Sequence, residues 1–136
     1  NYNDYSTAQA WTKVGPSLSV TYAGQNSCAA RVSYGLAYGG QPIPSKPEFQ
    51  TNLNSDGKRY IISAEKLRGY LNWRWCEPDY TWSSSGIHTI ESLRALLMDG
   101  KIAVIAWNDH TAVVTPTYKD QYTPRDGDGD IWILSP

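Results

Sequence analysis

The feature that most constrains this chain is a change in hydrophobic spacing near residue 100. Before it, apolar residues recur at intervals of three and four, as in amphipathic helices; after it, they form short runs, as in strands. Helices first and strands last is typical of an α+β protein, with N-terminal helices packed on a small antiparallel sheet. The 136 residues contain no repeat and no long linker. We therefore expect one domain covering residues 1–136.

Helix-capping and helix-ending residues divide the chain further. Ser63 and Thr89 are suitable N-caps, and Asn26 or Ser27 is another. Glycine at residues 39–40 and at residue 100 is expected to end two of the helices. The expected helices cover residues 8–14, 26–36, 64–75 and 90–99; the expected strands cover residues 59–62, 101–107, 111–115 and 131–134. Residues 41–56, with three prolines, and residues 80–86 are expected to be loops.

Composition excludes several classes of protein. The formal net charge is −1, with 12 Lys and Arg against 13 Asp and Glu, so the excess of positive charge typical of nucleic-acid binders is missing. No apolar run approaches the roughly 20 residues that span a bilayer, so we expect no membrane insertion. Two cysteines and two histidines are too few for a disulfide scaffold or a zinc finger. We expect neither a metal nor a cofactor.

Cys28 is the residue with the clearest signs of a role in catalysis. It falls in the first turn of an expected helix, where unpaired N–H groups and the helix dipole stabilise a thiolate. A nucleophilic cysteine also needs a base, and His110 lies at the start of an expected strand. An acidic group that orients the imidazole would complete the set. Asp120 is ten residues beyond His110, and three further aspartates follow at positions 126, 128 and 130.

Each of these residues also has a structural interpretation. Cys28 could pair with Cys76 in a disulfide or fill a small space in the core, and residue types alone do not separate these interpretations from catalysis. His110 could be an ordinary histidine at a strand edge, after the turn-forming pair Asn108-Asp109. His88 precedes a helix cap in a loop, and we interpret it as a surface residue.

The alternating Asp-Gly run at residues 126–130 superficially resembles a calcium-binding loop. An EF-hand requires glycine at the sixth position of that loop, and here the sixth position is Ile131. We therefore interpret the run as a solvated turn between strands.

Residues 26–36, Asn-Ser-Cys-Ala-Ala-Arg-Val-Ser-Tyr-Gly-Leu, resemble the nucleophile helix of a known family. The family is the type VI secretion amidase effectors of the fourth family, papain-like enzymes that cut bacterial peptidoglycan. Its motif runs Asn, a small residue, Cys, Ala or Pro, any residue, Arg, an aliphatic residue, Ser, Tyr, any residue, Leu. Further stretches resemble the family in the same order: residues 41–44, 58–62, 67–71, 78–79, 101–105, 120–121 and 131–134.

The resemblance implies a papain-like cysteine hydrolase fold and assigns roles by position. Cys28 corresponds to the nucleophile, His110 to the general base and acid, and Asp120 to the group that orients the imidazole. It also implies an antibacterial toxin that cleaves the D-glutamyl–meso-diaminopimelate bond of peptidoglycan stem peptides. Such a toxin is secreted by the type VI system, acts in the periplasm of the target bacterium, and has a cognate immunity protein that plugs its cleft.

The sequence departs from the family pattern at several positions. Asp109 stands where the family usually has glycine before its histidine. Lys119 and Tyr122 flank Asp120, where some relatives have two cysteines, so no local disulfide is expected there. If Cys28 is the nucleophile, Cys76 is an incidental thiol.

Two rival hypotheses compete with this one. The first is a non-catalytic exported domain that binds sugar or peptide, with a Cys28–Cys76 disulfide and with the six Trp and ten Tyr residues forming its binding surface. The second keeps the papain-like enzyme but gives it protein or glutamine-type amides as substrates.

Overall fold

The structure is a computed structural model that describes residues 28–135. The helix expected at residues 8–14 and the N-cap expected at Asn26 or Ser27 lie outside these residues. In chain order the elements are α3 (Cys28–Tyr38), η2 (Pro47–Phe49), β1 (Thr51–Leu53), β2 (Arg59–Ile61), α4 (Ala64–Trp75), β3 (Tyr80–Trp82), α5 (Ile90–Arg94), β4 (Ile102–Ala106), β5 (Thr111–Val114) and β6 (Gly129–Leu134).

The strands form two antiparallel sheets. β1 and β2 make a small two-stranded sheet, and the other four strands are ordered β3-β6-β4-β5. In the larger sheet Ala106 of β4 lies opposite Thr111 of β5 on one side and Asp130 of β6 on the other. The strands expected at residues 59–62, 101–107, 111–115 and 131–134 are thus confirmed, as is the expected α+β class.

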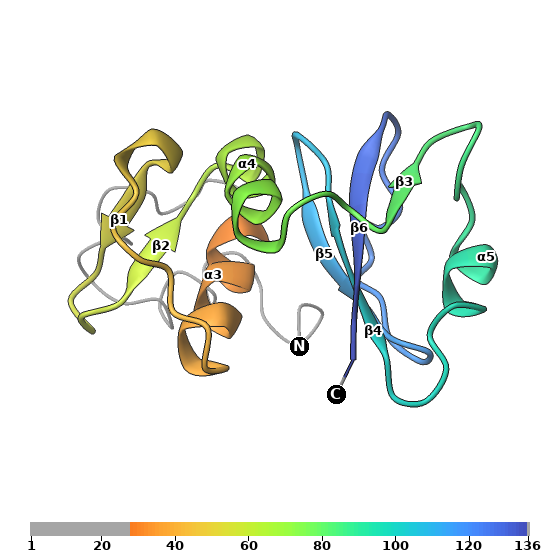
Figure 1. Cartoon of the computed structure of the whole chain (residues 1–136), viewed down its shortest axis with the longest axis horizontal. Helices are drawn as coiled ribbons and strands as arrows, with labels where there is room; N and C mark the ends of the chain where they lie inside the picture. The colour runs from red at the N-terminus through yellow and green to blue at the C-terminus, as the bar shows by residue number, and fades with distance from the viewer. Residues whose placement is uncertain (1–27, 136) are drawn as a thin grey trace.

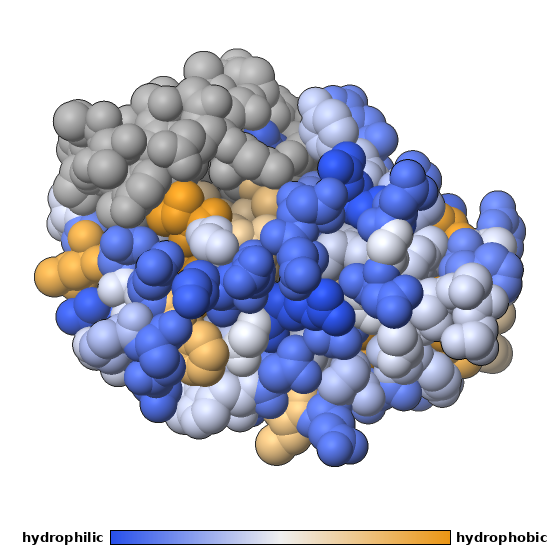
Figure 2. Space-filling model, turned by 90° about the horizontal axis from the view of Figure 1, so that it is seen from above, coloured by the Kyte–Doolittle hydropathy of each residue, from blue (hydrophilic) through white to orange (hydrophobic). Residues whose placement is uncertain are grey.

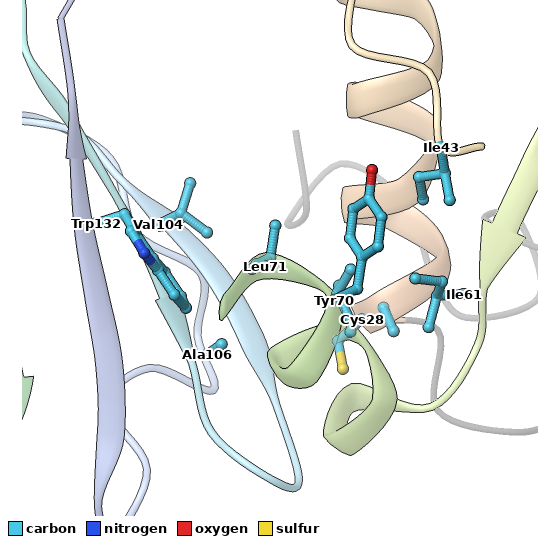
Figure 3. Packing of buried hydrophobic residues seen from close by; sticks show 10 residues of the cluster. Cys28, Ile43, Ile61, Tyr70, Leu71, Val104, Ala106 and Trp132 are labelled. Atoms are coloured by element: carbon cyan, nitrogen blue, oxygen red, sulfur yellow. The ribbon is translucent and has the colours of Figure 1, made fainter. Parts of the chain in front are cut away.

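The helices occupy both faces of the larger sheet. α3 and α4 lie between the β1–β2 sheet and one face of the larger sheet, and α5 lies on the other side (Figure 1). Ile61, Leu71 and Trp132 belong to the core that joins the helices to the sheet (Figure 3). Leu93, Trp107 and Ile131 belong to a second core beneath α5. Helix α3 and the β4–β5 turn therefore lie on opposite sides of the first of these cores, α3 with the helices and the turn with the sheet.

The termini of these helices follow from their sequence. α3 ends in a Schellman motif: Gly40 has a φ of +89°, and the Gln41 N–H donates to the Leu36 carbonyl at 2.9 Å. α4 begins as predicted, because the Ser63 hydroxyl accepts the Lys66 N–H at 3.3 Å. The buried residues of α4 are Leu67, Tyr70 and Leu71, which share one face of the helix.

Three expectations about the elements were wrong. The stretch expected as loop at residues 41–56 contains η2 and β1, and residues 80–82 of the second expected loop form β3. Both strands have only three residues and depend on pairing with β2 and β6, which local composition does not reveal. The helix after Thr89 ends at Arg94, well before Gly100, although Leu97 beyond its end is still buried.

The surface seen from above is mostly hydrophilic, with hydrophobic side chains in small groups (Figure 2). Trp73 is 48% exposed, whereas Trp75 contacts Trp132 of the core, so only one of these two neighbouring indoles faces inward. Among the residues that the structure describes, no helix has the length and apolar character needed to cross a membrane.

Candidate active site

Cys28 is the first described residue of α3, the helix in whose first turn the sequence places it. Its side chain is buried, with 2% exposure, and it belongs to the core that contains Tyr70 of α4. Figure 3 shows the sulfur at the boundary between α3 and α4. The first turn of α3 contains no acidic side chain, so nothing there opposes the positive end of the helix dipole.

His110 lies in the turn between β4 and β5 and is equally buried, with 2% exposure. The indole of Trp107 stacks on its ring, with the centroids 6.2 Å apart and the planes at 20°. The ring of Tyr122 meets it edge-on at 6.3 Å. These two aromatic rings limit the orientations that the imidazole can adopt.

Asp120 lies beside His110, so the structure brings the two predicted residues together. Its two carboxylate oxygens lie 3.3 and 3.2 Å from Nε2 of His110. The same carboxylate accepts the Tyr122 N–H at 2.7 Å and the Thr123 hydroxyl at 3.0 Å. Burial would raise the pKa of Asp120, but these hydrogen bonds and the charge of His110 outweigh it, and the pKa is lowered. Asp120 is therefore a fixed, ionised acceptor.

His110 interacts with Cys28 as well as with Asp120. Burial by itself would lower the pKa of His110, but hydrogen bonds to Asp120 and Cys28 and electrostatic interaction with both residues raise it to about 9. Because Asp120 takes Nε2, the nitrogen that remains for the Cys28 sulfur is Nδ1. At neutral pH the arrangement is an imidazolium held between a carboxylate and a sulfur. Such a group can stabilise a thiolate and then donate a proton.

The other candidate residues lie elsewhere. Cys76 is exposed at the C-terminal end of α4, and both cysteines remain thiols, so the Cys28–Cys76 disulfide hypothesis is contradicted. His88 is exposed, as expected for a surface residue. Asp109, which replaces the family's glycine, is exposed and accepts Arg125 Nη2 at 2.9 Å.

Residues 126–128 of the Asp-Gly run form the expected exposed bend, whereas residues 129–130 belong to β6 and are not part of the turn. Asp126 and Asp128 are exposed, while the Asp130 carboxylate binds Arg68 and Asn72 of α4. Among residues 28–135, no three His, Cys, Asp or Glu side chains gather in a way that could hold a metal ion.

Sequence reasoning missed the residues that hold Asp120 and His110 in place. Thr123 and the stacking ring of Trp107 were not foreseen, and Tyr122 was noted only as a neighbour of Asp120. One local signal was present: an aspartate whose carboxylate accepts the N–H two residues later forms an Asx turn. Asp120 and Tyr122 have that spacing.

Comparison with known proteins identifies the family. The family model described as "Type VI secretion system (T6SS), amidase effector protein 4" (Tae4) matches residues 24–132. No match was found among curated proteins.

Similar solved structures include Tae4 from Enterobacter cloacae, with a TM-score of 0.75 and 23% identity over 97% of this chain and 89% of that one. Tae4 from Salmonella typhimurium, in complex with the immunity protein Tai4 from Enterobacter cloacae, gives a TM-score of 0.73 and 24% identity over 98% and 92% of the two chains. At these identities the structures establish the fold, and the family model covers most of the chain. The chain therefore belongs to the Tae4 family of type VI secretion amidase effectors, enzymes that act on peptidoglycan in the periplasm of the target bacterium.

Proposed function

We propose that this amidase is a cysteine enzyme that cleaves the D-glutamyl–meso-diaminopimelate bond of peptidoglycan stem peptides, with Cys28, His110 and Asp120 as its catalytic residues. One observation carries the proposal: a buried imidazole has hydrogen bonds both to a fixed carboxylate and to a cysteine at the first residue of a helix. This is the geometry that nucleophilic catalysis by cysteine requires.

In the first half of the reaction, the Cys28 thiolate attacks the amide carbonyl carbon and a tetrahedral oxyanion forms. Backbone N–H groups at the start of α3, including that of Cys28, stabilise the oxyanion. The C–N bond then breaks while His110 donates its proton to the leaving amine. The products of this half are a free amine and a thioester on Cys28.

In the second half, water attacks the thioester carbonyl while His110 accepts the proton of the water. The C–S bond breaks, the carboxylate product leaves, and the thiolate–imidazolium pair is restored. Asp120 keeps the ring oriented through Nε2 in both halves and offsets the charge of the imidazolium.

The direct test of the nucleophile uses purified sacculi and analysis of the released muropeptides. Cys28→Ala and Cys28→Ser are expected to abolish cleavage, whereas Cys76→Ser is the matched control and is expected to retain it, because Cys76 is exposed and has no base beside it. Hydrolysis that continues unchanged in Cys28→Ala would contradict the proposed mechanism.

The bond specificity needs a separate test against the second rival hypothesis. Incubation with sacculi is expected to produce a new D-glutamate carboxyl group and a new diaminopimelate amine in equal amounts. Glutamine-type amides and ordinary peptides are expected to remain intact. Intact sacculi together with turnover of those other amides would replace the proposed substrate with the rival one.

A cognate immunity protein is part of the proposal. Tae4 from Enterobacter cloacae and Tae4 from Salmonella typhimurium have each been solved in complex with Tai4. We expect this chain to bind a protein of the same type that blocks access to Cys28. Co-expression with the cognate immunity protein should abolish cleavage of sacculi by the wild-type chain.

A further inference from the structure

We propose that Arg68 of α4 is a positioning residue. It holds the β4–β5 loop, and with it His110, in a fixed position relative to the helix that carries Cys28. The proposal rests on the proposed roles of Cys28 and His110. Arg68 does not touch either of them, and it acts through the loop residue Asn108.

The guanidinium of Arg68 has a hydrogen-bond partner at every nitrogen. Nε and Nη2 form a two-pronged interaction with the Asp130 carboxylate at 2.8 and 3.3 Å. Nη1 donates to the Asn108 side-chain oxygen at 3.0 Å and to the Asp128 carbonyl at 3.3 Å. Its planar shape therefore fixes the loop before His110 and the start of β6 at the same time.

Asp130 is itself held firmly, so it is a rigid anchor for Arg68. Asn72, one turn further along α4, donates to the same carboxylate at 2.9 Å. The ion pair is partly buried, with side-chain exposures of 23% for Arg68 and 15% for Asp130. Burial and two-pronged geometry distinguish this pair from surface ion pairs, which fix little.

The β4–β5 loop needs an external contact of this kind. Only Asn108 and Asp109 separate Trp107 from His110, and the Trp107 N–H donates to the His110 carbonyl at 2.8 Å. The two-residue loops that match strand twist require positive φ angles, and neither Asn108 nor Asp109 has one. Both residues are exposed, and the ion pair of Asp109 with Arg125 is itself 40% and 56% exposed, so neither burial nor that pair holds the loop firmly.

α4 is a suitable element to supply that contact, because it is packed together with α3. Leu67, the neighbour of Arg68, is fully buried in the core that contains Cys28. A rigid link from α4 to Asn108 therefore fixes the position of the imidazole relative to the sulfur. Contacts within the sheet do not fix the position of the imidazole relative to the sulfur, because Cys28 is not part of the sheet.

The experiment measures the thiolate–imidazolium pair without using a substrate. In a Cys76→Ser background, Cys28 is the only thiol, and its ionisation is followed by ultraviolet absorbance of the thiolate as pH is varied. Arg68→Gln and Asn108→Ala are compared with Arg74→Gln, a control on the exposed side of the same helix. Asn108→Ala leaves the Arg68–Asp130 pair intact, so it remains informative if Arg68→Gln fails to fold.

We expect the midpoint of thiolate formation to rise in Arg68→Gln and in Asn108→Ala but not in Arg74→Gln. Turnover of sacculi should fall about tenfold or more in kcat while KM changes less than about twofold, as expected for misplaced reacting groups. Midpoints that match the Arg74→Gln control would overturn the proposal. If the parent itself does not cleave sacculi, the proposed function fails, and the thiolate titration still decides the role of Arg68.

Discussion

Replacing Asp120 with asparagine should remove a part of the folding stability that depends strongly on pH. The substitution keeps the shape of the side chain but removes the negative charge that faces Nε2 of His110. Both partners are buried, with side-chain exposures of 3% and 2%, so solvent screens their interaction little. In Asp120→Asn a protonated imidazole would be buried without a carboxylate partner, which costs free energy. The pKa of His110 should therefore be lower in this variant than in the wild type.

The size of the effect follows from the pKa of His110, which the fold raises from 6.5 to about 9. At 1.36 kcal/mol per pH unit this difference corresponds to about 3 kcal/mol of stability. Because the pKa is raised, that stability is fully present below pH 6.5 and is lost as pH rises through about 9. Cys28 provides part of the stabilisation, so we expect Asp120→Asn to lose about 1–3 kcal/mol below pH 6.5.

Asp120 contributes with the opposite dependence on pH. Its pKa is lowered from 3.8, so its contribution is present above pH 3.8 and is lost as pH falls through the lower, folded value. The difference in stability between the wild type and Asp120→Asn should therefore be largest between pH 3.8 and 6.5. It should shrink as pH rises from 6.5 to about 9 and should be small above that.

Urea unfolding followed by tryptophan fluorescence measures this difference at each pH. Asp126→Asn is the matched control, because Asp126 is an exposed aspartate of the same loop. Repeating the comparison in a Cys28→Ser background isolates the part that belongs to Asp120. A difference between wild type and Asp120→Asn that does not vary with pH would refute the reasoning, since it would mean that the imidazole and the carboxylate are not coupled.

Three further predictions concern packing, capping and surface charge. Gly129→Ala should lower the free energy of unfolding by about 1–3 kcal/mol, because its Cβ would lie 2.8 Å from Nε1 of the buried Trp107; a melting temperature equal to that of the wild type would contradict this. Ser63→Ala should cost about 1 kcal/mol through loss of the α4 N-cap, and Ser63→Asp should restore most of it. Arg125→Gln should cost less than about 1 kcal/mol because the pair with Asp109 is 40% and 56% exposed, and the remaining difference should vanish in high salt.

The helices could be predicted because their signals are local. Ser63 and Thr89 are recognisable caps, and the three buried residues of α4 follow from helical spacing alone. β3 could not be predicted in the same way. It has three residues and forms only by pairing with β6, so its strand character is determined by residues about fifty positions away.

The same distinction applies to the site. Cys28 and His110 were singled out from local context, one at a helix start and one at a strand start. Asp120 was selected over three other aspartates by family resemblance alone, because spacing cannot tell which loop residue returns to the imidazole. Arg68 gave no signal in the sequence, since its partner Asp130 lies 62 positions away and the two meet only in the folded molecule.

The position of α3 beside the sheet has a consequence for solubility. The face of the larger sheet that α3 and α4 cover carries apolar side chains, among them Val104, Val113 and Trp132. Apolar surface of this kind promotes aggregation when it is exposed to solvent. The helix that begins with Cys28 therefore also shields the sheet, so variants that destabilise α3 should precipitate as well as displace Cys28.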